Sequence, residues 1–274
     1  MIDTQYCYLD DALGIKFIPE DYNSEQDQVG AQKYLDPDSK SKKLYRDLQE
    51  VWFEDCFQFK VDCNYNLIDK YENRYSSDFI GPSRYWAKRV GMRDDEIGSY
   101  LKHARTIGGH MLWPVHCIPT INSVRGGHGG FYDRIDLTLY EIQRYFLNEP
   151  AAYRTKRVRN QIEEKEKWFF DILCENAKSP EEKFIRFIDF WKLKPFVDTN
   201  YQVLSLVYSD FEAKINVPIS PQEPIFPGNN RNITITTNKI LDDEQKAVLL
   251  PEFKRYVKNN VIAIKQRNTL ICEK

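Results

Sequence analysis

Patterns typical of β-strands lie mainly in the first half of the chain, whereas helical patterns dominate the second half. The alternation of Phe57, Phe59 and Val61 predicts a strand, and residues 66–86 predict a second strand with its loop. An apolar run around 106–118, interrupted by one proline, predicts a buried central strand. Because these strands are not interleaved with the later helices, we expect an α+β fold, in which early strands and a central strand pack against a mainly helical C-terminal half.

The clearest helix is predicted to begin at Asp133. Apolar residues recur there at helical spacing and form one stripe, namely Ile135, Leu139, Ile142 and Phe146. Asp133 is a residue type favoured at the N-cap, and Asp136 follows at a first-turn position that favours acids. Further helices are predicted over 41–52, 94–105, 158–177, 180–193, 197–208 and 242–265.

Length and composition favour one globular domain over 1–274. A chain of 274 residues can bury a substantial core, and 42% hydrophobic residues supply the material for it. Residues 1–40 are polar and rich in turn-forming residues, which predicts a partly draped N-terminal arm. Residues 209–274 are interpreted as a C-terminal extension of the same domain.

Charge and targeting signals narrow the functional classes. Because 41 acidic residues nearly balance 39 basic ones, any affinity for nucleic acid or anionic lipid must be local. No apolar run reaches the roughly 18 residues of a membrane span, and the N-terminus lacks the layout of a secretory signal. Six scattered cysteines without a Cys-x-x-Cys pair indicate reduced, structural thiols. We therefore expect a cytoplasmic protein with no membrane partner.

The histidines of the chain fall within one short window, which points to residues 103–144 as the functional centre. Imidazoles titrate near neutral pH, and arginines in the same window can hold anions. This combination predicts acid–base or anion-stabilising catalysis on a negatively charged substrate. The histidines are His103, His110, His116 and His128, and the candidate catalytic residues are His110, His128, Arg125 and Asp133.

A glycine-rich loop over 125–130 leads into the helix predicted at Asp133. Glycines let backbone N–H groups approach a ligand, and the start of a helix favours an anion. The loop therefore predicts a phosphate site. Its sequence is neither a P-loop nor a dinucleotide fingerprint, so an ordinary flexible surface loop is an equal alternative. The candidate binding residues are Asn122, Arg125, Gly126, Gly127 and Arg134, with either arginine holding the phosphate.

Structural roles compete with these assignments. The histidine spacings of seven, six and twelve residues match no zinc motif, so no metal site is predicted. His110 and His116 lie in an apolar stretch, which is also typical of a core histidine with satisfied ring nitrogens. Arg125 and Asp133 can equally form an ion pair that pins the loop to the helix, and capping is the preferred role for Asp133.

A second candidate site lies at Tyr75, Ser76 and Ser77, just after a predicted strand. A tyrosine there can stack on a base or on nicotinamide, and serines can hydrogen-bond a ribose. An ordinary turn is the alternative. The basic run at 154–159 can contact phosphates, but acidic residues follow it directly, so a solvated helix face is the preferred interpretation.

The sequence resembles a bacterial family of proteins of unknown function over about residues 36–208. The motifs that carry this resemblance are Asp36-Pro37-Asp38, Val51-Trp52, Ile107-Gly108-Gly109, Asn122-Ser123-Val124-Arg125-Gly126 and Asp133-Arg134-Ile135-Asp136-Leu137-Thr138-Leu139. The family implies no activity. A looser similarity links Tyr75-Ser76-Ser77 to the strand that shapes the nicotinamide pocket of ADP-ribosyltransferases. Arg46 and Glu223 would supply the other two elements, and this similarity implies NAD as a substrate.

Together these features lead us to expect an enzyme acting on a nucleotide or nucleic-acid substrate. Its specific form would be an NAD-consuming, ADP-ribosyltransferase-like bacterial toxin or antiviral effector. The first alternative is a non-catalytic binding or regulatory protein of a toxin–antitoxin or defence system, with an antitoxin or chaperone as partner. Its support is the 17 tyrosines and 16 phenylalanines available for docking. The second alternative is a metal-dependent hydrolase or nuclease.

Overall fold

The computed structural model describes residues 2–9, 41–52, 58–61, 67–115, 134–152, 155–220 and 241–273. Its sheet has four antiparallel strands in the order β1-β2-β3-β4. All of them lie in the first half of the chain, and the C-terminal half is mainly helical, so the predicted α+β class is confirmed. The strands are β1 (Lys60–Val61), β2 (Leu67–Ile68), β3 (Arg74–Phe79) and β4 (His110–Pro114).

Helices lie both within and after the strand region. Among the described residues before 115, the helices are α4 (Lys42–Trp52), α5 (Arg84–Arg89), α6 (Asp94–Ala104) and the 3-10 turn η2 (Ile107–Gly109). Those after it are α8 (Ile135–Phe146), α9 (Lys156–Gln161), the π-helical turn η3 (Ile162–Glu166), α10 (Lys167–Ile172), α11 (Pro180–Phe190), the 3-10 turn η4 (Lys194–Phe196) and α12 (Asp243–Cys272). Within the described ranges, no helix has both the length and the apolar character that a membrane span requires.

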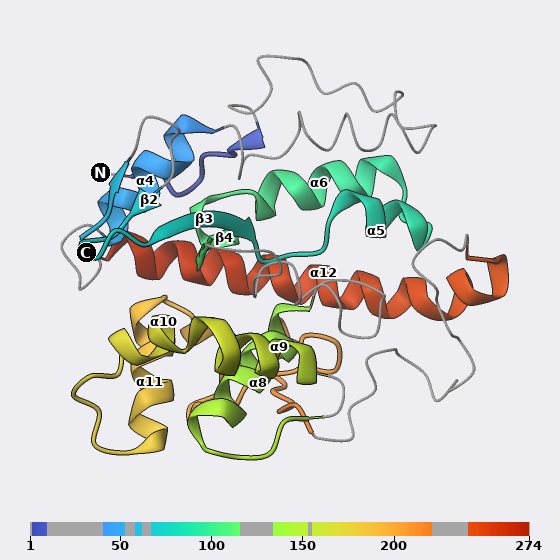
Figure 1. Ribbon diagram of the computed structural model, residues 1–274. Coiled ribbons are helices and arrows are strands. Elements are labelled where there is room, and N and C mark those ends of the chain that lie inside the picture. Colours follow the sequence, from blue (N-terminus) through green and yellow to red (C-terminus); the bar gives the residue numbers. More distant parts are fainter. Residues whose placement is uncertain are drawn as a thin grey trace.

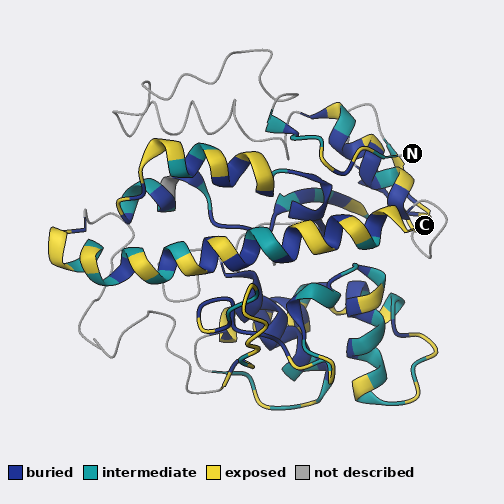
Figure 2. Cartoon of the chain, turned by 180° about the vertical axis from the view of Figure 1, so that it is seen from behind, coloured by how far each residue is buried: buried dark blue, intermediate teal, exposed yellow. Residues whose placement is uncertain are grey.

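The helix α12 runs through the middle of the molecule (Figure 1). The sheet and α4 to α6 lie on one side of it, and α8 to α11 lie on the other. Seen from behind, buried residues concentrate in the sheet and in the helices next to α12 (Figure 2). The segment interpreted as a C-terminal extension therefore supplies the central helix, which Asp242 and Gln245 start with a reciprocal capping box.

The pair β3 and β4 forms the centre of the sheet, in register from Tyr75 opposite Pro114 to Phe79 opposite His110. Along β3 the buried residues alternate with more exposed ones, whereas all five residues of β4 are buried. The first pattern is that of a strand with one covered face, and the second is that of a strand covered on both faces. The proline predicted to interrupt the central strand instead forms its last residue, where a missing N–H is tolerated.

The helix predicted over 197–208 does not form. Val197 and Val203 pair in an isolated antiparallel bridge, and the residues between them make a turn. One carboxylate oxygen of Asp198 accepts hydrogen bonds from the backbone N–H groups of Asn200 and Gln202, each at 2.8 Å. An aspartate that satisfies local backbone donors in this way competes with helix formation, which is why the helical prediction is wrong here.

The basic run at 154–159, of which Arg154 lies outside the described residues, is only partly the solvated face that the sequence favours. Lys156 and Arg157 are exposed. Arg159, however, is buried, and its Nε lies 2.8 Å from a carboxylate oxygen of Glu141, which is itself fully buried. The prediction is therefore wrong for Arg159, because this residue forms an ion pair between α9 and α8.

The side chain of Arg267 joins α12 to both halves of the protein. Its guanidinium is fully buried and donates to three carbonyl oxygens. Nε and Nη2 contact the carbonyl of Trp191 at 3.1 and 2.9 Å, and Nη1 contacts those of Gly108 and His110 at 2.8 and 2.7 Å. Burial lowers the pKa of Arg267 to about 9, so the side chain is a cation at neutral pH.

One described thiol, that of Cys174, is buried, as expected of a structural cysteine. Cys7, Cys174 and Cys272 are free cysteines within the described residues. Burial raises the pKa of the Cys174 thiol to about 11, which leaves almost no reactive thiolate at neutral pH.

Candidate functional site

The described histidines of the predicted centre do not share a site. His103 is exposed on α6, whereas His110 is fully buried in β4. The Nδ1 atom of His110 lies 3.1 Å from the hydroxyl of Ser77, which is also buried. The ring of Tyr8 packs edge-on against the same imidazole. Two predicted site residues, His110 and Ser77, are thus brought together, but as a polar pair inside the core. The burial agrees with the alternative of a core histidine, although the contact of Nδ1 with Ser77 is to a side-chain hydroxyl and not to the backbone.

Arg134 is also enclosed, and its expected role as an accessible phosphate ligand is corrected. Its exposed fraction is 1%, and its Nε and Nη2 donate to the two carboxylate oxygens of Asp136 at 3.0 and 2.6 Å. Asp136 also accepts a hydrogen bond from the backbone N–H of Leu206. The helix α8 begins at Ile135, with Arg134 in place of Asp133 as the N-cap residue. The pair therefore fixes the start of α8 against the chain near Leu206.

Several other candidates lie outside the described residues. They are Asn122, Arg125, Gly126, Gly127, His128 and Asp133, together with His116 and Glu223. Their predicted roles in phosphate binding and catalysis stay predictions.

Tyr75 does not offer a face to a ligand, contrary to the expectation for the Tyr75-Ser76-Ser77 segment. Its ring is fully buried and packs edge-on against Phe59 and Trp168, with centroid separations of 4.8 and 6.1 Å. Ser76 is half-buried. The prediction is wrong for Tyr75, because the alternation of β3 turns this side chain toward the core and leaves Arg74 on the other face.

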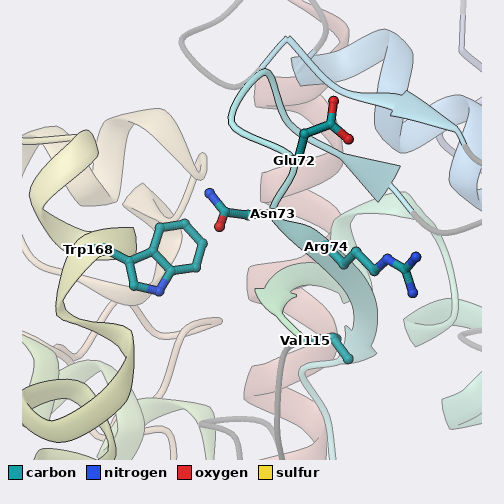
Figure 3. Close-up of a pocket in the computed structure, with 5 residues that line it drawn as sticks. All are labelled: Glu72, Asn73, Arg74, Val115 and Trp168. Carbon is teal, nitrogen blue, oxygen red and sulfur yellow. The ribbon is translucent and has the colours of Figure 1, made fainter.

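A hollow of about 420 Å³ opens beside this strand, between the tip of the β2–β3 hairpin and α10. Trp168 and Asn73 face each other in Figure 3, whereas the side chains of Glu72 and Arg74 extend away from the indole. We call it the hairpin hollow, and its lining residues are Glu72, Asn73, Arg74, Val115 and Trp168.

The buried carboxylate of Asp69 builds the turn that carries this lining. One of its oxygens accepts from the backbone N–H groups of Tyr71 and Asn73 at 2.8 and 2.9 Å. The other accepts from the Asn73 side-chain amide at 3.0 Å and from the Tyr75 hydroxyl at 2.8 Å. Since one side chain satisfies four donors, the hairpin tip has a defined shape. Asn73 and Arg74 are held at the hollow by this turn.

Of the two charged residues that line the hairpin hollow, Glu72 has an ion-pair partner and Arg74 has none among the described residues. Glu72 pairs with Lys60 at 2.7 Å on the surface. Arg74 is exposed and has no ion-pair partner within the described part of the chain. The amide nitrogen of Asn73 is engaged by Asp69, so its carbonyl oxygen is the part available as an acceptor. The hollow therefore combines an aromatic face, an acceptor and a guanidinium.

Replacing Asp69 with alanine is expected to lower the free energy of unfolding by roughly 3 kcal/mol, because it leaves buried donors without an acceptor. The chain offers a matched control in Asp198. Its carboxylate also accepts hydrogen bonds from the backbone N–H groups of the residues two and four positions later. Asp198 is less buried, so Asp198→Ala should cost only about 1 kcal/mol. Urea unfolding followed by tryptophan fluorescence measures both, and equal losses would contradict the role given to burial.

None of the residues that line the hairpin hollow was a candidate from the sequence, and this includes Asn73, Arg74 and Trp168. Trp168 stands in a helical segment next to exposed charged residues, and this position was compatible with a solvated helix face. A tryptophan within a run of charged residues is the local signal, but its partner Asn73 is 95 positions away. Only the packing of α10 against the hairpin places the two together.

The described residues form neither a metal site nor the nicotinamide pocket that the similarity to ADP-ribosyltransferases implies. Within the described ranges, no group of three or more His, Cys, Asp or Glu side chains is placed to hold a metal ion. Arg46 is exposed on α4, whereas Ser77 is buried behind Tyr45, whose hydroxyl accepts from the Ser77 backbone N–H. The likeness to ADP-ribosyltransferases is therefore not confirmed.

Comparison with known proteins identifies a family for the chain. No curated protein and no solved structure matches it. A family model matches residues 2–271, a range that includes nearly all of α12, whereas the motifs quoted for the resemblance over 36–208 are not confirmed as features of that family. Because this match covers nearly the whole chain, the protein belongs to the family of unknown function DUF6994.

Proposed function

We propose that the protein binds a nucleotide, free or as a unit of nucleic acid, in the hairpin hollow. The observation that carries the proposal is the presence of Trp168 and Arg74 around one hollow of about 420 Å³. That volume lies within the range of roughly 300–1,000 Å³ for small-molecule sites. An aromatic face and a guanidinium are the two groups that suit a base and a phosphate.

The two ends of the ligand would bind on different sides of the hairpin tip. The base would stack on the indole of Trp168, and the carbonyl oxygen of Asn73 would accept a hydrogen bond from an exocyclic amine of the base. Arg74 extends away from Trp168, so the phosphate would lie at the opposite end (Figure 3). A nucleotide has this order of an aromatic ring, a sugar and a phosphate.

The binding test is a titration with AMP, NAD and a short single-stranded RNA, followed by calorimetry. We expect Trp168→Leu to weaken binding roughly 5- to 100-fold, since stacking contributes about 1–3 kcal/mol per base. Arg74→Ala should weaken it about tenfold or more, by loss of a charged hydrogen bond. The matched controls are Trp86→Phe on α5 and Arg157→Ala on α9, both away from the hollow. Wild-type protein that binds none of the three ligands, or variants that bind like the controls, would refute the proposal.

The enzymatic form of the proposal is an NAD-consuming transferase of a toxin or defence system. Its support is the planar nicotinamide ring of NAD, which suits the face of Trp168. Release of nicotinamide from NAD, lost in Trp168→Leu, would support this form. Binding without any release, together with co-purification of a partner, would favour the non-catalytic regulatory alternative.

A further inference from the structure

A second hollow, of about 260 Å³, lies between the middle of α12 and the segment around Ser209. It is distinct from the hairpin hollow and shares no lining residue with it. We call it the basic hollow, and its lining residues are Ser209, Asp210, Lys254, Arg255, Lys258 and Asn259.

The floor of the basic hollow is rigid. Asn259 is buried, and its amide nitrogen donates to the carbonyls of Leu206 and Ser209, each at 2.7 Å. The hydroxyl of Ser209 accepts from the backbone N–H of Val217 at 2.9 Å. Because these polar groups are already engaged, the floor positions the charged side chains around it and does not itself need a ligand.

Three cations from two successive turns of α12 surround this floor. Lys254 pairs with Glu96 at 2.7 Å, and Lys258 pairs with Glu212 at 2.6 Å. Arg255 is exposed, and it has neither a hydrogen bond nor an ion pair with any residue that the structure describes. Arg255 is therefore the cation of this hollow whose donors are open to a ligand.

A carboxylate faces the same space. One oxygen of Asp210 accepts from the backbone N–H groups of Glu212 and Ala213, both at 3.1 Å. The Ala213 N–H is the main cause that lowers the pKa of Asp210, and the nearby charges of Lys258 and Arg255 lower it further. Asp210 is thus ionised at neutral pH, and its second oxygen can accept a hydrogen bond.

We propose that the basic hollow binds a sugar phosphate. Arg255 and Lys258 would hold the phosphate, since a guanidinium fork matches its oxygens. The ionised Asp210 would repel a bare anion but would accept hydrogen bonds from sugar hydroxyls, so the hollow suits a phosphate attached to a polyol. A volume of about 260 Å³ is below the usual range for larger ligands, which favours a sugar phosphate over a whole nucleotide.

Calorimetric titration of the full chain with ribose 5-phosphate, inorganic phosphate and ribose tests this site. Ribose 5-phosphate should bind more tightly than inorganic phosphate, and ribose should not bind measurably. Arg255→Ala should weaken ribose 5-phosphate binding about tenfold, the loss expected of one charged hydrogen-bonding group. Lys265→Ala removes a charge from the same helix at an exposed position outside the hollow and should leave affinity unchanged.

The Asp210→Asn variant tests the sugar contact separately, because asparagine keeps one oxygen for the Glu212 and Ala213 donors. It should bind inorganic phosphate more tightly than wild type and lose the preference for ribose 5-phosphate. The proposal is overturned if wild-type protein binds neither phosphate compound, or if Arg255→Ala behaves like Lys265→Ala. Trp168→Leu should not affect this titration, which separates the failure of this site from that of the hairpin hollow.

Discussion

Replacing Arg267 with methionine is expected to lower the free energy of unfolding by roughly 3–5 kcal/mol or to prevent folding. Methionine fills much of the same volume but cannot donate to the carbonyls of Trp191, Gly108 and His110. Those carbonyls lie in the part of the core where η2, β4 and the end of α11 meet α12. The loss would therefore detach the central helix from both halves of the protein.

Two further variants sharpen this experiment. Arg267→Lys keeps the positive charge but has a single ammonium nitrogen in place of the planar guanidinium with its several N–H donors. We therefore expect a loss of unfolding free energy between those of the other two variants. Lys265→Met, two positions away and exposed, should change stability by less than about 0.5 kcal/mol. Urea unfolding followed by far-UV circular dichroism measures all three. A loss for Arg267→Met no larger than that for Lys265→Met would show that the buried hydrogen bonds contribute nothing to stability.

Replacing Gly109 with alanine is expected to destabilise the protein by about 3 kcal/mol or more. A Cβ atom at this position would lie 1.8 Å from the backbone carbonyl oxygen of Ala104, at the end of α6. The obstacle is backbone, so no side-chain rotation can relieve it. A Cβ atom at the neighbouring Gly108 would lie 2.5 Å from the side-chain oxygen of Asn268 and 2.7 Å from the backbone oxygen of Ile264, both on α12. The Ile107-Gly108-Gly109 motif is thus explained by two close backbone approaches.

The matched control is Gly98→Ala, in the middle of α6. A Cβ atom there would meet nothing within 4 Å, and alanine favours a helix interior over glycine by roughly 0.5–1 kcal/mol. We expect this variant to raise the midpoint of thermal unfolding while Gly109→Ala lowers it. Opposite shifts from the same chemical change would isolate the steric cause, whereas a stable Gly109→Ala would mean that α6 and η2 separate at little cost.

Local pattern was sufficient to predict the class of the fold and most of its elements. Periodicity placed α6, α8 and α11 within a few residues of their bounds, because the apolar face of a helix is visible in a short window of sequence. It also placed the start of α12, but it ended this helix at 265, whereas the helix continues to Cys272. It misplaced a helix over 197–208, where the carboxylate of Asp198 satisfies the backbone in a turn. Periodicity reports which side chains share a face, but not which backbone groups a polar side chain will satisfy.

The sequence by itself determined the α+β order of strands and helices, the glycine pair before β4 and the absence of a strong overall charge. Tertiary structure alone decided which charged residues are enclosed and which line a hollow. Arg134 and Arg267 are buried, whereas Arg74 and Arg255 are exposed, although all four are the same residue type. The physical reason is distance along the chain, since the acceptors that allow Arg267 to be buried include Gly108, 159 positions earlier. No local pattern reports such a partner.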